Sequence, residues 1–182
     1  MSDLRPLVND AHRFAPAAPD DSLVYGACCP GWHSAAAHET AIDQWLSFMD
    51  DQGIERVCCL LPGRQLDSHG ANVSRYRDAF GDDAVEHVPI PDLHLADGET
   101  LREDILPFLD DAVAAEEPVV VHSLAGIGRT GQVLAAWLVH GRGYHPPEAI
   151  DTVRQMGRDP MEPIEEGTAT RLELLDVLES LT

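Results

Sequence analysis

Near the middle of the chain, an apolar strand passes through a glycine-rich turn directly into a helix. The segment reads Val119-Val-Val-His-Ser-Leu-Ala-Gly-Ile-Gly-Arg-Thr-Gly131. A turn of this kind presents consecutive backbone N–H groups and the N-terminus of a helix to an anion. Arg129, at the start of the helix, adds a planar guanidinium that matches two phosphate oxygens. The segment therefore predicts a phosphate-binding strand-loop-helix unit.

The same glycines also fit two motifs of nucleotide-binding proteins, but neither motif is complete. The dinucleotide fingerprint G-x-G-x-x-G needs an acidic residue about 20 positions further on, at the end of a second strand. Here that distance reaches Glu148 and Asp151, which lie in a predicted helix. The ATP-binding P-loop needs a lysine after its last glycine, and the chain contains no lysine. We therefore favour a phosphate site of another type.

The run His122-Ser-x-x-Gly-x-Gly-Arg-Thr resembles the active-site loop of the protein tyrosine phosphatase superfamily, H-C-x-x-G-x-G-R-[ST]. Every fixed position matches except the cysteine, where this chain has Ser123. The resemblance extends from the strand near Val57 to Leu178. It is greatest to the small dual-specificity branch, including its compact atypical members.

The resemblance implies a role for each residue of the loop. Backbone N–H groups would hold the phosphoryl oxygens, Arg129 would clamp two of them, and the Thr130 hydroxyl would help a thiolate leave in the second step. His122 is expected to order the loop through hydrogen bonds. A phosphate or sulfate anion is the expected occupant, and the superfamily's chemistry uses no metal or other cofactor. The cradle residues, whose two glycines are expected to adopt positive φ angles, are Leu124, Ala125, Gly126, Ile127, Gly128 and Arg129.

Within this resemblance, Asp92 is the candidate general acid. It follows a predicted strand in Val88-Pro-Ile-Pro-Asp92 and lies 31 positions before Ser123, as in the small phosphatases. Asp97 is the alternative, with His94 between the two. A polar residue that orients the hydrolytic water is also expected, and spacing does not choose among Glu162, Glu165 and Glu166.

Ser123 occupies the position of the nucleophilic cysteine. A loop of this kind lowers a thiol pKa from about 8.5 to roughly 3.5–7.5, whereas a serine hydroxyl starts far higher. We therefore expect turnover to be nearly lost and phosphate affinity to be retained, since a neutral hydroxyl repels a dianion less than a thiolate does. Two origins fit the serine. One is an active dual-specificity phosphatase whose cysteine was replaced to trap substrate, which we favour; the other is a natural pseudophosphatase that acts as a phospho-residue binding module.

Hydrophobic periodicity predicts an alternation of strands and helices. Such alternation is typical of an α/β fold with a mainly parallel central sheet flanked by helices on both faces, as in tyrosine phosphatases. We expect a loosely held lead-in over residues 1–22, a single phosphatase domain over residues 23–182, and a loop over Pro62–Gly70. The predicted strands are Leu23–Cys28, Glu55–Leu61, Ala84–Ile90 and Val119–Val121; the predicted helices cover Glu39–Asp51, Val73–Phe80, Leu101–Ala112, the segment around Val133–Leu138, Glu148–Met156 and Leu172–Leu178.

Acidic residues dominate the charge: 32 Asp and Glu against 12 arginines give a net charge of −20. The acids are spread along the chain, which favours a halophilic surface in a salt-rich cytoplasm, where ions screen the repulsion. No basic patch is present to neutralise nucleic-acid phosphates, so we expect no nucleic-acid partner. The chain shows no signal peptide and no apolar run of roughly 18 residues. We therefore expect a cytoplasmic protein without membrane contact.

The four cysteines form two adjacent pairs without metal-ligand spacing. Inert core thiols are the favoured interpretation, and redox regulation is the alternative, for Cys28, Cys29, Cys58 and Cys59.

The expected substrate is a phosphorylated protein or peptide. The larger tyrosine-specific domains of the superfamily contain a separate loop that deepens the pocket, and no counterpart is recognisable in this chain. The resemblance therefore implies a shallow pocket that accepts phosphotyrosine and also phosphoserine or phosphothreonine. The absence of lysines in the cradle argues against phosphoinositides, and the negative surface argues against nucleotide or RNA substrates. Arg64 and Arg75 are candidates for contacts with acidic residues beside the phosphorylated residue, with ordinary surface charge as the alternative.

Overall fold

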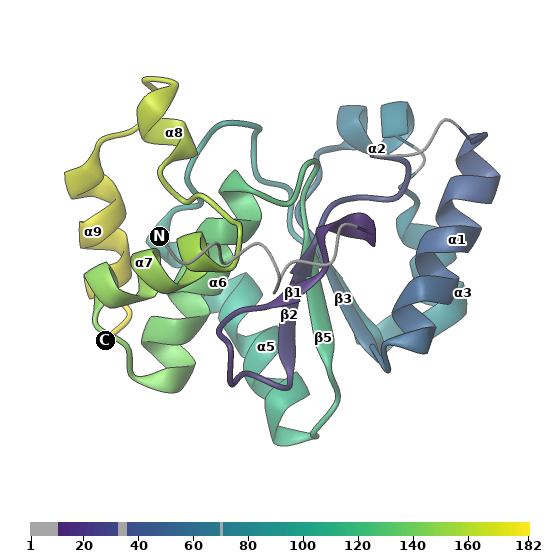
Figure 1. The fold of residues 1–182 in the computed structure, drawn as a ribbon, viewed down its shortest axis with the longest axis horizontal. Coiled ribbons are helices and arrows are strands. Elements are labelled where there is room, and N and C mark those ends of the chain that lie inside the picture. The colour runs from purple at the N-terminus through teal and green to yellow at the C-terminus, as the bar shows by residue number, and fades with distance from the viewer. Residues whose placement is uncertain (1–10, 33–35, 70) are drawn as a thin grey trace.

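A five-stranded sheet with helices on both faces forms the centre of the molecule (Figure 1). The structure is a computed structural model and describes residues 11–32, 36–69 and 71–182. The strand order is β1-β2-β5-β3-β4; β1 runs antiparallel to β2, and the other neighbours are parallel. The predicted α/β class with a mainly parallel sheet is confirmed. The strands are β1 (Ala15–Pro16), β2 (Val24–Ala27), β3 (Arg56–Cys59), β4 (Val85–His87) and β5 (Val119–His122).

Helices α1 and α3 cover one face of the sheet, and α5, α6, α7 and α9 lie on the other side (Figure 1). Helices α2 and α8 lie at the edge of the molecule where the parallel strands end. The helices are α1 (His38–Asp51), α2 (Gly63–His69), α3 (Val73–Phe80), α4 (Gly98–Thr100), α5 (Leu106–Ala114), α6 (Gly128–Arg142), α7 (Pro146–Gln155), α8 (Glu162–Glu165) and α9 (Arg171–Glu179); short turns of other helical type cover Ala11–Arg13, Asp82–Ala84 and Leu101–Ile105.

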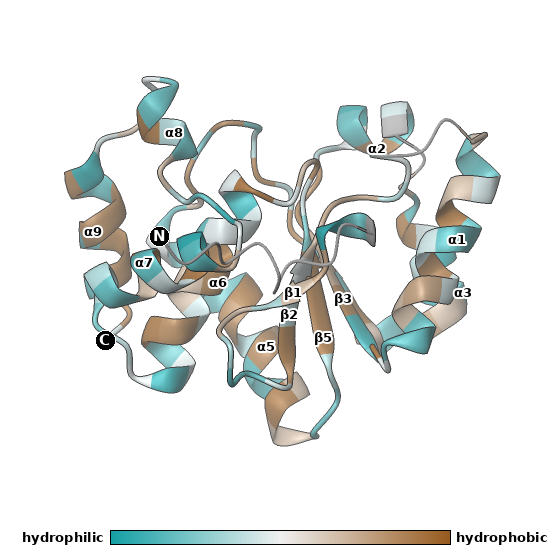
Figure 2. Ribbon diagram, viewed as in Figure 1, coloured by the Kyte–Doolittle hydropathy of each residue, from teal (hydrophilic) through white to brown (hydrophobic). Residues whose placement is uncertain are grey.

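The central strand β5 is buried on both faces. Because side chains alternate along a strand, Val119 and Val121 pack into the core beneath α5 and α6, while Val120 packs into the core beneath α1 and α3. A strand covered on both faces is apolar without interruption, and Figure 2 shows this strand as hydrophobic. The alternation sends His122 toward the α1 and α3 side, where its ring lies against those of Trp45 and Tyr76.

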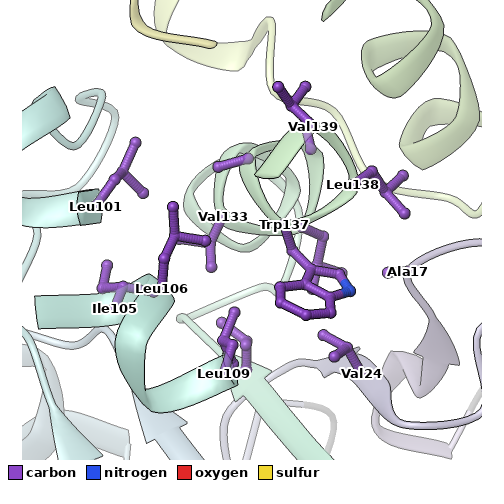
Figure 3. Packing of buried hydrophobic residues seen from close by; sticks show 14 of the residues in the cluster. Ala17, Val24, Leu101, Ile105, Leu106, Leu109, Val133, Trp137, Leu138 and Val139 are labelled. Atoms are coloured by element: carbon purple, nitrogen blue, oxygen red, sulfur yellow. The ribbon is translucent and has the colours of Figure 1, made fainter. Parts of the chain in front are cut away.

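On the other face, the apolar side of α6 anchors the larger core. Figure 3 shows Trp137 of α6 above Val24 of β2, with Leu109 of α5 beside it, all in one buried cluster. The apolar residues that recur with helical spacing after the glycine-rich turn therefore form the face of α6 that packs on the sheet. This packing fixes the direction in which α6 leaves the turn.

Several predicted boundaries differ from the structure. The loop predicted over Pro62–Gly70 is wrong, because Gly63–His69 forms α2. The carbonyl of Pro62 accepts hydrogen bonds from the N–H groups of Gln65 and Leu66, and Leu66 packs against the core. The helix is short and polar, so the sequence offers little apolar period to identify it.

The predicted strand Ala84–Ile90 is shortened to β4 for two reasons: residues 82–84 form a 3-10 turn, and the ladder loses its regular register after His87, where the N–H groups of Val88 and Ile90 donate to the adjacent carbonyls of Cys59 and Leu60. The predicted helix Leu101–Ala112 is present as a π-helical turn followed by α5. Among the described residues, no helix combines the length and apolar character needed to cross a bilayer.

Residues 11–22 of the predicted lead-in pack against the domain, and residues 1–10 lie outside the described part. Strand β1 pairs with β2, and Phe14, Ala17 and Ala18 are buried. The prediction of a loosely held segment is therefore wrong for residues 11–22. Strand β1 contains only two residues, so an alternation of buried and exposed side chains is too short to be recognised there.

Asp21 ties this segment to α6. Its carboxylate accepts hydrogen bonds from the N–H groups of Leu23 and Val24, from Trp137 Nε1 at 3.0 Å, and from Arg142. Burial alone would raise the pKa of Asp21, but these donors together more than offset it, so the pKa lies below its ordinary value. A depressed pKa stabilises the fold above the pKa of the unfolded chain, and this stabilisation is lost as pH falls through the folded value.

Replacement of Asp21 by asparagine is therefore expected to lower the free energy of unfolding by about 2 kcal/mol at pH 7. The loss shrinks under acid conditions, where Asp21 itself is protonated. Thermal unfolding at pH 7 and at pH 3 measures both effects. Asp20→Asn is the matched control, because Asp20 is exposed; equal melting temperatures for the two variants at pH 7 would contradict the role of Asp21.

Candidate active site

The glycine-rich turn curls between the end of β5 and the start of α6, and its carbonyl groups are bound from outside. The Ser123 carbonyl accepts a hydrogen bond from His122 Nδ1 at 3.1 Å, and the Leu124 carbonyl accepts one from the Cys29 N–H at 3.0 Å. The Gly126 carbonyl accepts one from Arg158 Nη1 at 2.6 Å. The Ile127 carbonyl accepts from the N–H groups of Gly131 and Asp159, at 3.0 and 3.1 Å.

These outward carbonyls determine where the N–H groups point. In a planar trans peptide, the C=O of one residue and the N–H of the next point in opposite directions. The N–H groups of Leu124, Ala125, Ile127 and Gly128 therefore face the inside of the curl. Within the described residues, none of them donates to another protein group. A ring of free N–H groups at a helix N-terminus is suited to an anion with several oxygens.

Gly126 makes the curl possible. Its φ angle is 76°, and a Cβ atom placed there would lie 2.4 Å from the Ala27 carbonyl oxygen. The expectation of positive φ is thus confirmed at Gly126 and wrong at Gly128. Gly128 instead begins α6 and leaves space for Glu162, whose carboxyl carbon would lie 3.1 Å from a Cβ at that position.

The Arg129 guanidinium is almost fully buried beside the curl. Nη1 donates to Gln65 Oε1 at 2.8 Å and to the Ile90 carbonyl at 2.9 Å, while Nη2 lies 3.0 Å from Asp92 Oδ1. Burial lowers the pKa of Arg129, and the charges of Asp92 and Glu162 oppose that shift. Gln65 was not a predicted site residue, since no local pattern indicates that α2 reaches the turn.

Asp92 and Asp97, the two candidate acids, have different surroundings. Asp92 is 46% exposed and its carboxylate faces Arg129. Asp97 caps α4 by accepting a hydrogen bond from the Thr100 N–H at 2.7 Å, and this contact lowers its pKa. His94 donates from Nδ1 to the Asp92 carbonyl at 2.8 Å. Of the two aspartates, only Asp92 contacts the arginine of the turn.

The segment that carries Asp92 is held in place by two contacts. The buried amide of Gln132, one turn along α6 from Arg129, accepts from the Ala96 N–H at 2.7 Å and donates to the Ala96 carbonyl at 2.9 Å. The Thr168 hydroxyl donates to the carbonyl of Leu93, whose φ angle is 60°. The Gln132 contacts join the aspartate segment to the same helix that carries Arg129, and the Thr168 contact joins it to the segment after α8. Gln132 and Thr168 were not identified from the sequence.

Ser123 and Thr130 share a hydrogen bond of 2.7 Å between their hydroxyl oxygens inside the curl. His122 lies on the opposite side of the strand. Its Nδ1 donates to the Ser123 carbonyl, so its Nε2 accepts from the Tyr76 hydroxyl at 3.0 Å. Burial lowers the pKa of His122 to about 4. This neutral histidine faces away from the Ser123 hydroxyl, and therefore it cannot serve as a base for that hydroxyl.

The three candidate glutamates differ in their surroundings. Glu162 is half-buried beside Gly128, and burial, followed by the charges of Asp92 and Asp159, raises its pKa. Glu165 and Glu166 are exposed. Glu162 is thus the glutamate that lies at the turn.

The remaining predicted residues lie apart from the turn's interior. Arg64 is exposed on α2, and Arg75 pairs with Asp43 of α1. All four cysteines are buried, and burial raises their thiol pKa values, to about 11 for Cys28 and about 12 for Cys29. Buried thiols of high pKa are poor nucleophiles.

Proteins with similar sequences and structures include phosphatases. The dual specificity protein phosphatase Mpk3 of Drosophila melanogaster is 34% identical over 79 residues, which are 43% of this chain and 19% of that protein. The aligned segment is therefore about a fifth of the fly protein's length.

Solved structures share the fold. The active form of Tk-PTP matches with a TM-score of 0.65 and 26% identity, over 91% of this chain and 96% of that one. Kinase associated phosphatase, with its catalytic cysteine substituted by serine, has a TM-score of 0.64 and 19% identity, over 86% and 84% of the two chains.

A family model for the DSP-PTPase phosphatase of polymorphic toxin systems matches residues 32–142, which contain the turn, Arg129 and Asp92. Because this match covers more than half of the chain, the protein belongs to the DSP-PTPase phosphatase family.

Proposed function

We propose that this chain binds the phosphate of phosphorylated protein residues in the cradle formed by Leu124–Arg129, in the manner of a dual-specificity phosphatase. The observation that carries the proposal is the set of outward carbonyls, since it leaves the N–H groups free beside the Arg129 guanidinium. Preorganised donors of this kind stabilise both a bound dianion and the charge that develops on the oxygens during phosphoryl transfer.

We further propose that the site hydrolyses phosphomonoesters when cysteine occupies position 123. The thiolate attacks phosphorus while the P–O ester bond breaks, and the Asp92 carboxyl gives its proton to the leaving oxygen. Water then attacks the phosphocysteine and returns a proton to Asp92. The thiolate leaves with a hydrogen bond from Thr130, and Glu162 orients the water. An incoming phosphate would take Arg129 from Asp92 and free that carboxyl for this role.

The chain with Ser123 is expected to stop at binding. The serine hydroxyl has Thr130 as its partner, and both ring nitrogens of His122 are engaged by other groups, so this histidine cannot act as its base in the described part of the chain. The two origins of the serine, a substrate-trapping form and a natural binding module, predict the same behaviour for this chain. They differ in the cysteine variant, since a long-established binding module is not expected to regain turnover.

The proposed substrates are peptides that carry phosphotyrosine, phosphoserine or phosphothreonine. The absence of lysine disfavours polyphosphorylated lipid headgroups, which need several cations. With a net charge of −20, the protein is proposed to act in a salt-rich cytoplasm. Assays belong at 1 M KCl or above, where the Debye length falls to about 3 Å.

Replacement of Ser123 by cysteine is expected to raise hydrolysis of para-nitrophenyl phosphate by about 10⁴–10⁶-fold over the unmodified chain. Adding Asp92→Asn to that variant is expected to lower kcat by about 100-fold, because the leaving oxygen loses its proton donor. Asp97→Asn is the matched control, since an asparagine still caps α4. A folded Ser123→Cys variant without hydrolysis would refute the catalytic part of the proposal.

The phosphate affinity of the unmodified chain is expected to depend on Arg129. Arg129→Lys keeps the charge but loses the planar fork and the contacts to Gln65 and Ile90, so the Kd for inorganic phosphate should rise by about tenfold. Isothermal titration measures this change. Arg75→Lys, which keeps a cation beside Asp43, is the control; the same Kd for all three proteins would argue against the cradle.

Within the Ser123→Cys variant, Glu162→Ala is expected to slow the second step and not the first. Rapid mixing with an aryl phosphate should then show a burst of one phenol per active site, followed by a rate lower by about tenfold. Glu165→Ala, in the same helix but exposed, should leave the steady rate unchanged. A burst and steady rate equal to those of the parent variant would exclude Glu162 from water orientation.

A further inference from the structure

Arg158 is a buried cation directly behind the phosphate cradle. It follows α7 and is only 2% exposed. Its Nη1 donates to the Gly126 carbonyl and its Nη2 donates to the Arg13 carbonyl, each at 2.6 Å. Among the described residues, no carboxylate forms an ion pair with it, unlike Arg129, which has Asp92. A buried guanidinium without a counter-charge is costly and calls for a physical reason.

The residues around Arg158 accommodate its guanidinium without satisfying all of its hydrogen bonds. Its Nε atom is buried and has no hydrogen-bond partner. Among the described residues, it is the only buried side-chain nitrogen or oxygen atom without one. Gly26, in the middle of β2, faces this atom, and a Cβ there would lie 2.7 Å from Nε. A glycine inside a strand often marks a close approach of another group. Here the approaching group is the guanidinium.

The contact with Gly126 acts on the cradle through peptide geometry. Because Arg158 holds the Gly126 carbonyl outward, the N–H of Ile127 in the same peptide faces the inside of the curl. Burial lowers the pKa of Arg158 to about 10, so the group keeps its charge at neutral pH. The carboxylates near the turn are Asp92, Glu162 and Asp159; they outnumber the one cation Arg129, and Arg158 adds a second.

We propose that Arg158 is a positioning residue for anion binding, which orients the Gly126–Ile127 peptide and supplies the second positive charge that a phosphate dianion requires. This inference rests on the proposed phosphate binding. In this proposal the bound anion is the counter-charge that Arg158 lacks, and the Gly126–Ile127 peptide lies between the two. In a protein of such acidic character, a cation shielded from solvent acts more strongly than one on the surface.

The test is titration of inorganic phosphate into the unmodified Ser123 chain and three variants, at pH 8 in 1 M KCl. Arg158→Gln keeps a donor for the Gly126 carbonyl and removes the charge, so its Kd should rise by about tenfold. Arg158→Lys keeps the charge and should raise the Kd less than about threefold. Arg142→Gln is the matched control: it removes a partly buried arginine at the other end of α6, about 20 Å away along the helix, and should leave the Kd unchanged.

Circular dichroism and the melting temperature establish that each variant is folded. A folded Arg158→Gln with the Kd of the unmodified chain would overturn the inference and leave the proposed function intact. Failure of the unmodified chain to bind phosphate would overturn both. Should Arg158→Gln not fold, Arg158→Lys still tests the inference, because a tenfold loss of affinity in this folded, charge-conserving variant would refute the role of the charge.

Discussion

The carbonyl groups of the turn between β5 and α6 point outward, and the chemistry of this molecule depends on that orientation. Four of them are held by groups outside the curl, contributed by His122, Cys29, Arg158 and the start of α6 with Asp159. Each outward carbonyl turns the next N–H inward. The proposed anion site is therefore not a property of the turn alone. It is a consequence of what packs around the turn.

These outer donors reach the turn through different parts of the fold. Cys29 follows β2, which pairs with β5, and Arg158 and Asp159 follow α7, which packs on α6. The sheet order and the packing of α6 thus work together, because a shift of either would remove a donor from a carbonyl. The alternation along β5 places His122 on the other face, where burial keeps it neutral and Tyr76 fixes its ring.

Electrostatics gives the site its second constraint. The surface carries a strong negative charge, and two carboxylates, Asp92 and Glu162, lie beside the cradle. Arg129 is already paired with Asp92, whereas Arg158 is unpaired among the described residues. A bound dianion would release Asp92 and meet the charges of both arginines. Such an exchange links anion binding to the freeing of the proposed proton donor.

The α/β class, the mainly parallel sheet and the turn follow from local patterns, because apolar periodicity and the glycine-arginine motif are continuous in sequence; Asp92 follows from the resemblance to the small phosphatases. The sequence by itself also favours Asp92 over Asp97, but only the tertiary structure shows that Asp97 caps a helix while Asp92 faces Arg129. Gln65, Gln132 and Arg158 were beyond local patterns, as were helix α2 and the choice of Glu162 among the three candidate glutamates. Their roles arise from contacts between segments distant in the chain, and a single sequence carries no signal for which distant polar side chain meets which backbone group.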